Sequence, residues 1–161
     1  MDPIKQFEEE KIRNIRALGR NKKAKKLALD LVRASYPNRY SYNFEWLGRP
    51  IIQYPQDMVA MQEIIWDVKP DLVIETGIAH GGSLIFYASL LELLGKGKVL
   101  GIDIDIRKHN RKLIEAHPFY KRIAMLEGSS VDPAVLKKVA RIAKKHKKVM
   151  LFILYLFFII F

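Results

Sequence analysis

The segment Asp71–Ser83, which reads DLVIETGIAHGGS, constrains the fold of this chain more than any other stretch. Four apolar or β-prone residues surround one acid, Glu75, and a turn with three glycines follows. Ser83 then opens a long apolar stretch that is typical of a helix. A strand, a glycine turn and a helix start, in this order, form a small-molecule pocket at the carboxyl end of a parallel strand. Glycine lets the backbone approach a ligand closely, and the helix N-terminus offers free N–H groups.

After this segment the chain alternates strands with helices. Strands are predicted at 72–76, 98–103 and 122–127 and from Val149, and helices at 83–94, 107–116 and 132–145. This alternation predicts an α/β fold, with a partial parallel sheet of about four strands and helices on both faces. The sheet domain is expected to span residues 56–161 and to open with a helix at 56–68.

Residues 1–55 are predicted to form an N-terminal helical extension and an aromatic lead-in. Helices are expected at 3–18 and 21–35, with Gly19–Arg20 as the break between them. The segment from Ser35 to Pro55 is expected to be irregular, because its three prolines oppose a regular element.

The C-terminal segment Val149–Phe161 contains thirteen residues with no charge, glycine or proline. It is too short to cross a bilayer as a helix, which needs about 20 residues, so no membrane partner is expected. A buried strand would need only about five or six of these residues. We therefore expect a fourth strand that starts near Lys148, followed by an aberrant tail in which the reading frame is lost. Sequencing the gene downstream of codon 148 tests this hypothesis.

Composition excludes several classes of function. The chain has no cysteine, which excludes disulfides, thiolate metal sites and cysteine nucleophiles, and no secretory signal is visible, so a cytoplasmic location is expected. The net charge of +11 permits a non-catalytic module that binds nucleic acid or an anionic surface, and this remains the alternative function. The basic clusters at 22–26 and 107–148 lie beside helical apolar spacing, which favours solvated helix faces and makes nucleic acid an unlikely partner.

Three loops that follow successive strands are expected to meet at one edge of the sheet. The acid that ends the second strand is placed to accept hydrogen bonds from a ribose, and the serine pair after the third strand can meet an adenine edge or satisfy its own turn. The ligand implied is a nucleoside with a cationic, amino-acid-like end. The cofactor-binding candidates are Glu75, Gly77, His80, Gly81, Gly82, Ser83, Asp103, Ser129 and Ser130.

Other ligands fit this turn less well. The dinucleotide fingerprint G-x-G-x-x-G lacks its second glycine here, and Glu75 would sit badly near a pyrophosphate, which disfavours a nicotinamide-dependent oxidoreductase. No GK[ST] follows the turn, so a P-loop is excluded. The pattern therefore favours S-adenosylmethionine. His80 is a weak catalytic candidate as a general base, and a role in positioning the backbone is the favoured interpretation.

The motifs PDLVIETGIAHGGS, VLGIDIDIR and EGSSVDP together resemble the cephalosporin hydroxylase-like family, which includes rhamnosyl O-methyltransferases. The upstream WLGRPIIQYPQD resembles the lead-in of that family, and the match extends from about Tyr40 to Lys148. The resemblance implies a Rossmann-like methyltransferase fold and an S-adenosylmethionine-dependent O-methyltransferase that acts on a hydroxyl of a sugar or small natural product. A homo-oligomer is left open.

The resemblance also implies roles for individual residues. Glu75, Gly77 and Gly81 would line the methionine end of the cofactor, Asp103 would hold the ribose, and Ser129 and Ser130 would flank the adenine. Family members continue after the fourth strand with an acidic, histidine-containing segment that helps to bind a divalent metal such as Mg²⁺. The corresponding stretch here is LFILYLFF, so no metal ligand is assigned and the chain is expected to retain only the cofactor half, with weak or no turnover.

Overall fold

The computed structural model describes residues 2–153. The aberrant tail predicted after the fourth strand falls mainly on residues 154–161, which lie outside the described residues. The chain divides into two compact units, residues 1–40 and 41–161. The boundary after residue 55 that the sequence suggested remains a prediction.

The first unit contains two helices, α1 (Pro3–Arg20) and α2 (Lys22–Ser35), followed by a short 3₁₀ turn η1 (Tyr36–Asn38). The break between the helices lies at Asn21 and not at the predicted Gly19–Arg20, because the Asn21 side chain caps α2 by accepting a hydrogen bond from the Ala24 N–H at 3.0 Å. Neither helix contains a buried residue.

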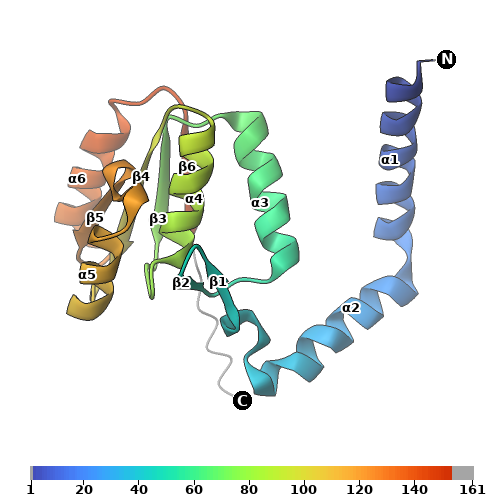
Figure 1. Ribbon diagram of the computed structural model, residues 1–161, viewed down its shortest axis with the longest axis horizontal. Helices are drawn as coiled ribbons and strands as arrows, with labels where there is room; N and C mark the ends of the chain where they lie inside the picture. The colour runs from blue at the N-terminus through green and yellow to red at the C-terminus, as the bar shows by residue number, and fades with distance from the viewer. Residues whose placement is uncertain (1, 154–161) are drawn as a thin grey trace. The chain divides into compact units, whose positions relative to one another are not determined.

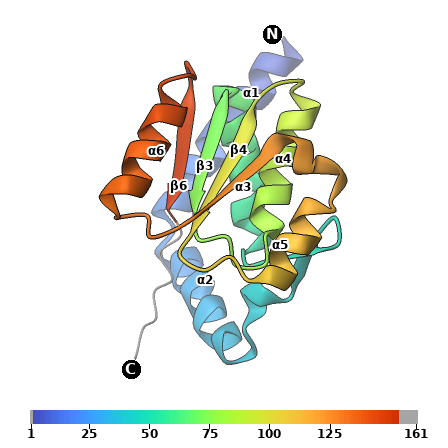
Figure 2. The same ribbon diagram turned by 90° about the vertical axis from the view of Figure 1, so that its left-hand side faces the viewer.

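The second unit is built on a parallel sheet of four strands, as predicted (Figures 1 and 2). The strands are β3 (Leu72–Thr76), β4 (Lys98–Asp103), β5 (Ile123–Glu127) and β6 (Val149–Ile153), in the spatial order β5-β4-β3-β6. The chain moves outward from β3 to β5 and then returns across the sheet to place β6 on the other side of β3. The order therefore reverses at β3, and such a switch point leaves a crevice outside the carboxyl ends of β3 and β6.

Helices cover both faces of the sheet, as the alternation predicted (Figure 2). Residues of alternating parity along β3 face opposite layers, so Val73 packs in one core and Ile74 in the other. One face carries α3 (Pro55–Val68), α4 (Gly82–Leu93) and α5 (Lys108–Glu115), and the other carries α6 (Pro133–Ala143). None of the described helices has the length and apolar character needed to span a membrane.

Strand β6 contains the first five residues of the apolar tail, Val149–Ile153, which confirms the predicted fourth strand. Phe152 lies opposite Glu75 in the register and its ring stacks on Tyr87, with ring centroids 4.9 Å apart. On the other face, Val149, Leu151 and Ile153 are exposed in the described part of the chain.

The lead-in is more regular than predicted. It contains a second 3₁₀ turn, η2 (Tyr40–Tyr42), and an antiparallel hairpin of β1 (Phe44–Trp46) and β2 (Arg49–Ile51). The two turn residues, Leu47 and Gly48, both have positive φ, as a tight hairpin turn requires. Pro50 is compatible with this two-stranded ribbon because a proline is tolerated at a sheet edge.

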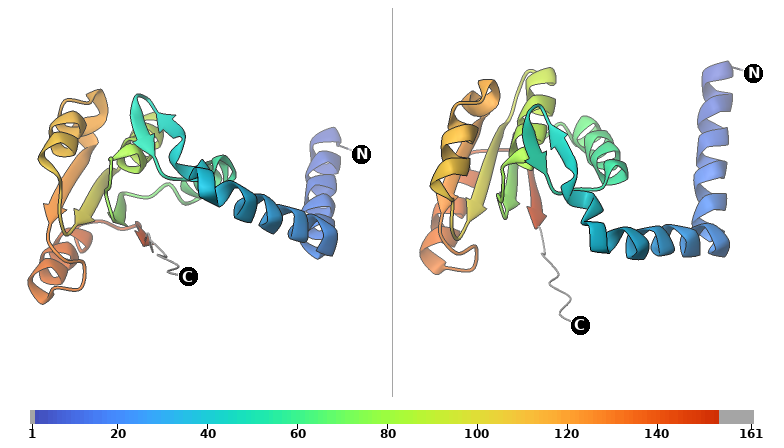
Figure 3. Two further views of the ribbon diagram at one scale, coloured as in Figure 1. Left: turned by 90° about the horizontal axis from the view of Figure 1, so that it is seen from below. Right: turned by 60° about the horizontal axis from the view of Figure 1, so that its bottom comes forward.

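The hairpin packs against the beginning of α4 (Figure 3). The Trp46 indole N–H donates to the Ser89 hydroxyl of α4 at 3.1 Å. A Cβ atom added to Gly82 would lie 2.2 Å from the Pro50 carbonyl oxygen. Only glycine at this position allows the two backbones to approach so closely.

Candidate functional site

The turn between β3 and α4, residues 77–82, occupies the carboxyl edge of the sheet next to the switch point. Some N–H groups of this turn donate to an acceptor within the protein, and others do not. The Ile78 and Ala79 N–H groups donate to Asp103 Oδ2 at 2.7 and 3.3 Å. The Gly77 N–H donates to the Ile102 carbonyl, and the Gly81 N–H donates to the Ile78 carbonyl. Within residues 2–153, the N–H groups of His80, Gly82 and Ser83 have no hydrogen-bond acceptor.

Two carbonyl groups of the same turn are held from the protein side. The Arg49 guanidinium of β2 donates from Nε and from Nη2 to the His80 carbonyl, with the Nε bond at 3.0 Å. The Asn110 amide of α5 donates to the Ala79 carbonyl at 2.9 Å, and its oxygen accepts from Arg49 Nη2 at 3.1 Å. Arg49 and Asn110 are both buried, so the turn is fixed by a connected polar network.

Glu75 lies inside the protein rather than in an open pocket. Its side chain faces α4, because it shares the parity of Val73, and it is fully buried. Oε2 accepts a hydrogen bond from the Ser83 hydroxyl at 2.6 Å, whereas Oε1 is buried without a hydrogen-bond partner in the described part of the chain. A buried acceptor without a partner is unusual in a folded protein and marks a place where a ligand group could bind.

The pKa of Glu75 is raised to about 8, chiefly by burial and to a smaller extent by the nearby Asp103, although the Ser83 and Tyr87 hydroxyl groups oppose this rise. Tyr87 is thus close enough to influence the carboxyl group, although no hydrogen bond of ordinary geometry joins it to Oε1. At neutral pH the ligand-free carboxyl group is therefore mostly protonated. The sequence predicted that the Glu75 carboxylate favours a cationic ligand group, and its burial adds a cost of ionisation to that role.

Asp103 lies at the end of β4, where the sequence placed it, and it stabilises the turn. Besides the two turn N–H groups, its carboxylate accepts a bond from the Asp105 N–H at 3.2 Å. A carboxylate offers about four acceptor positions, so three are used and about one remains. Asp103 is half-exposed, and that remaining position can receive a ligand hydroxyl.

Ser129 and Ser130 lie in the loop after β5. The Gly128 N–H donates to the Asp103 carbonyl at 2.8 Å, so the structure brings this loop to the end of β4. The Ser129 hydroxyl accepts from the Val131 N–H at 3.4 Å, which matches the interpretation that it satisfies its own turn. Ser130 is exposed and Ser129 half-exposed, and both remain candidates for contact with a base.

The remaining turn residues have mainly backbone roles. The His80 imidazole is half-exposed, and the contacts of this residue run through its carbonyl group. Gly81 has a φ of +82°, and a Cβ atom there would lie 2.3 Å from the Ile114 side chain. Glycine at position 81 is therefore required both by conformation and by space.

Sequence reasoning missed Arg49, Asn110 and Gln53 at this edge. Gln53 Oε1 is a second buried acceptor without a hydrogen-bond partner among residues 2–153, and the Gln53 side chain influences the Tyr87 phenol. Asn110 had a recognisable signal, because asparagine is unfavourable inside a helix unless its side chain has another partner. The buried Arg49 side chain is satisfied by the His80 carbonyl, 31 residues away, and by Asn110, 61 residues away, which local sequence does not reveal.

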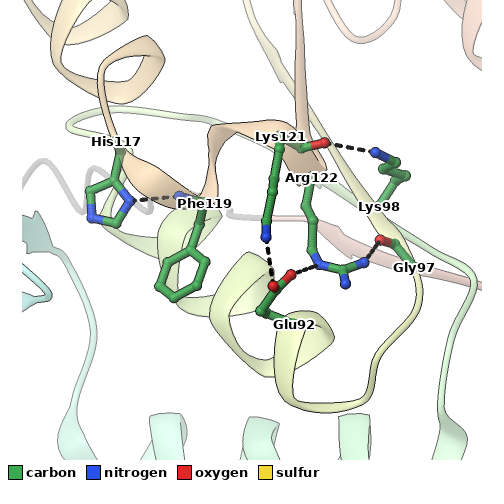
Figure 4. A network of polar contacts seen from close by, with 7 residues as sticks. All are labelled: Glu92, Gly97, Lys98, His117, Phe119, Lys121 and Arg122. Carbon is green, nitrogen blue, oxygen red and sulfur yellow. Dashed lines mark hydrogen bonds and ion pairs between the residues drawn. The ribbon is translucent and has the colours of Figure 1, made fainter.

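At the opposite, amino-terminal edge of the sheet, ion pairs connect α4 to the residues just before β5 (Figure 4). Glu92, near the end of α4, pairs with Lys121 Nζ at 2.6 Å and with Arg122 Nε. Arg122 Nη1 also donates to the Gly97 carbonyl at 2.9 Å, and Lys98 Nζ to the Lys121 carbonyl at 2.7 Å. Both cations stabilise the ionised carboxylate and hold the pKa of Glu92 below its usual value.

Residues 2–153 contain no group of three or more histidine, aspartate or glutamate side chains that could hold a metal ion. The donor set of the described chain therefore does not fit a divalent cation, which needs several oxygen ligands at fixed distances.

Comparison with known proteins places the chain in one family. Residues 38–155 match the family described as Rhamnosyl O-methyltransferase/CmcI. A rhamnosyl O-methyltransferase of Mycobacterium leprae (strain TN) is 29% identical over 123 residues, which cover 73% of this chain and 52% of that protein. A rhamnosyl O-methyltransferase of Mycobacterium bovis (strain BCG / Pasteur 1173P2) is 29% identical over 126 residues, which cover 73% of this chain and 49% of that protein. The chain thus spans about half the length of these curated relatives.

Among solved structures, the one titled "CmcI-N160 apo-structure" is similar with a TM-score of 0.54 and 19% sequence identity. The similarity covers 68% of this chain and 45% of that chain. At this identity the likeness supports the fold: a parallel sheet with its order reversed at β3 and helices on both faces.

Proposed function

Because the chain belongs to the Rhamnosyl O-methyltransferase/CmcI family, we propose that it serves S-adenosylmethionine-dependent O-methylation and that the carboxyl edge of its sheet is the donor site. The observation that carries this proposal is the pairing of unsatisfied groups at the switch point. A buried acceptor, Glu75 Oε1, lies beside a turn whose His80, Gly82 and Ser83 N–H groups have no acceptor among residues 2–153.

These groups are complementary to an amino acid. The methionine end of S-adenosylmethionine carries an ammonium and a carboxylate on neighbouring atoms. The ammonium suits Glu75 Oε1, and the carboxylate suits N–H groups at the start of α4, where the helix dipole also favours negative charge. Gly77, Gly81 and Gly82 would keep side chains out of the space that this end of the cofactor needs.

The nucleoside end has its own candidates. The remaining acceptor position of Asp103 would take a ribose hydroxyl, and Ser129 and Ser130 would lie beside the adenine. Because the turn already uses most of the Asp103 carboxylate, we expect one strong bond to the ribose rather than two.

Bound S-adenosylmethionine supplies a methyl group on a sulfonium centre, and transfer to a hydroxyl is a displacement that depends on alignment of donor and acceptor. The residues described above would hold and orient the donor. The acceptor would be a hydroxyl of a sugar or small natural product, and His80 is the only titratable side chain of residues 77–83 that could take its proton. The described residues do not fit a metal, so no step is assigned to one.

Isothermal titration of the 161-residue chain with S-adenosylhomocysteine tests the donor site. The protein should be shown to be folded by circular dichroism, and NADH serves as the control ligand. We expect saturable binding of S-adenosylhomocysteine and none of NADH. Folded protein that binds no S-adenosylhomocysteine would overturn the proposal.

A further inference from the structure

Arg49 is a buried cation that contacts the turn, but the proposed donor site assigns it no role in binding. Its side chain is largely inaccessible, with 7% of the residue exposed, and none of the ion pairs formed by the described residues includes it. Burial lowers its pKa, and Glu45 raises it only as a secondary effect. A buried charge without a close counter-ion is costly, so its presence requires an explanation.

The contacts of Arg49 determine the orientation of one turn. Arg49 holds the His80 carbonyl, and Asn110 holds the Ala79 carbonyl. In a trans peptide the N–H group points opposite to the carbonyl group. The N–H of His80 is therefore directed away from Asn110, and Arg49 supports this orientation by donating to Asn110 Oδ1 at 3.1 Å.

We propose that Arg49 and Asn110 are positioning residues that orient the turn N–H groups, His80 above all, toward the carboxylate of the amino-acid end of the donor. This inference rests on the proposed function. Arg49 also places a positive charge, which has no ion-pair partner among the described residues, next to the turn, and this charge favours an anionic group there. The hairpin that carries Arg49 is thus part of the donor site, although it lies outside the strand–turn–helix segment.

The arrangement predicts that substitutions of Arg49 and Asn110 weaken the binding of ligands with an amino-acid end and not the binding of every ligand. The amino-acid end of S-adenosylhomocysteine would depend on Arg49 and Asn110, whereas 5′-methylthioadenosine, which has the same nucleoside but no amino-acid end, would not. The affinity ratio of these two ligands therefore reports the orientation of the turn. Simple destabilisation of the protein would lower both affinities together and leave the ratio unchanged.

The experiment compares Arg49→Lys and Asn110→Asp with the wild-type chain by titration with both ligands. Lysine keeps the charge but cannot make the forked contact to a carbonyl, and aspartate loses the N–H donor to Ala79. We expect S-adenosylhomocysteine affinity to fall by roughly tenfold or more in each variant, with 5′-methylthioadenosine affinity changed less than about twofold.

Arg122→Lys is the matched control, because Arg122 also donates to a backbone carbonyl, that of Gly97, but at the opposite edge of the sheet. It should leave both affinities unchanged. An unchanged ratio in both test variants, or an equal loss for both ligands, overturns the positioning role while the donor site stands. Failure of the folded wild-type chain to bind S-adenosylhomocysteine removes the donor site itself, and the positioning role with it.

Discussion

Glu75 and Glu92 lie near opposite edges of the same sheet, and their carboxyl groups have opposite surroundings. Glu75 is fully buried at the carboxyl edge, has one acceptor atom without a partner within residues 2–153, and has a raised pKa. The Glu92 side chain is 32% exposed at the amino edge, is paired with two cations, and has a lowered pKa. Helix α4 connects the two edges, since it starts beside Glu75 and contains Glu92 near its end.

This difference distinguishes groups that stabilise the fold from groups that we propose to bind the donor. The amino edge satisfies its charges within the protein, and its ion pairs help to fix α4 against the start of β5. The carboxyl edge leaves a buried acceptor, several N–H groups and a buried cation without full compensation among the described residues. Incomplete satisfaction of buried polar groups is costly to folding, and a ligand that completes the set would recover that cost.

The largest expected effect comes from Glu75→Gln. The raised pKa means that the folded state holds a proton that the unfolded state releases above its ordinary value of 4.5, so wild-type stability should fall as the pH rises from 4.5 to about 8. Over this range the loss is about 5 kcal/mol. Glutamine cannot ionise, so the variant should lack this decline. Urea unfolding at pH 5, 6.5 and 8.5 measures the free energy of unfolding of both proteins. The same dependence on pH in wild type and variant would contradict the buried, protonated state of Glu75.

The second prediction concerns ligand affinity and depends on the proposed donor site. If the ammonium of S-adenosylhomocysteine pairs with ionised Glu75, binding below pH 8 must first remove a proton. Affinity should then rise by about 50-fold from pH 6 to 8, and binding at pH 7 should release close to one proton. Titration in buffers of different ionisation enthalpy counts this proton. An affinity that is independent of pH in the wild-type chain would show that Glu75 does not meet the ammonium.

A third prediction tests whether the carboxyl edge is closed by backbone contact. Gly82→Ala places a Cβ atom 2.2 Å from the Pro50 carbonyl oxygen, so the hairpin must move. We expect a loss of about 1 to 3 kcal/mol in the free energy of unfolding. Gly19→Ala in α1 is the control, because a Cβ atom there meets nothing within 4 Å and alanine favours a helix. Thermal and urea unfolding of both variants should show opposite signs, and equal effects would rule out the contact.

The smallest effect is expected at the amino edge. The lowered pKa of Glu92 means that its ion pairs contribute stability above the unfolded value of 4.5, and this contribution is lost as the pH falls through the folded pKa. Glu92→Gln should therefore lower the free energy of unfolding by a nearly constant amount between pH 6 and 9, and its difference from the wild type should disappear in acid. Urea unfolding at low salt measures this, and 0.5 M NaCl should reduce the difference between wild type and variant. A stability difference between wild type and variant that is larger in acid than at pH 6 to 9 would contradict this account.

The sequence predicted the sheet well because apolar periodicity is local. The bounds of β3 and β4 match the predicted 72–76 and 98–103, since each strand is a short apolar run with a clear stop. The hairpin was missed because Pro50 was taken as evidence against regular structure, although an edge ribbon tolerates it. Strand alternation could have shown that Glu75 faces the same layer as Val73, and hence inward.

Other properties of the site arise only from contacts between distant parts of the chain. Asp103 was predicted to hold a ribose, but its bonds to the Ile78 and Ala79 N–H groups depend on how the turn folds back over β4. The burial of Arg49 likewise requires the hairpin, the turn and α5 to meet. A charged residue in a loop is ordinarily expected to be exposed, so no local pattern indicated this burial.

The return of the chain to β6 has a consequence for the order of folding. Strand β3 can pair with β4 as soon as one helical crossover is made, but its other edge can pair only with β6. Asp71 and Lys148, which precede β3 and β6, are 77 residues apart. Pairing across so long a separation carries a larger entropic cost and is slow. During synthesis, β6 is also the last described strand to leave the ribosome. Strand β6 is therefore expected to join the sheet after β3, β4 and β5, and only then can the Phe152 ring stack on Tyr87 beside the proposed donor site.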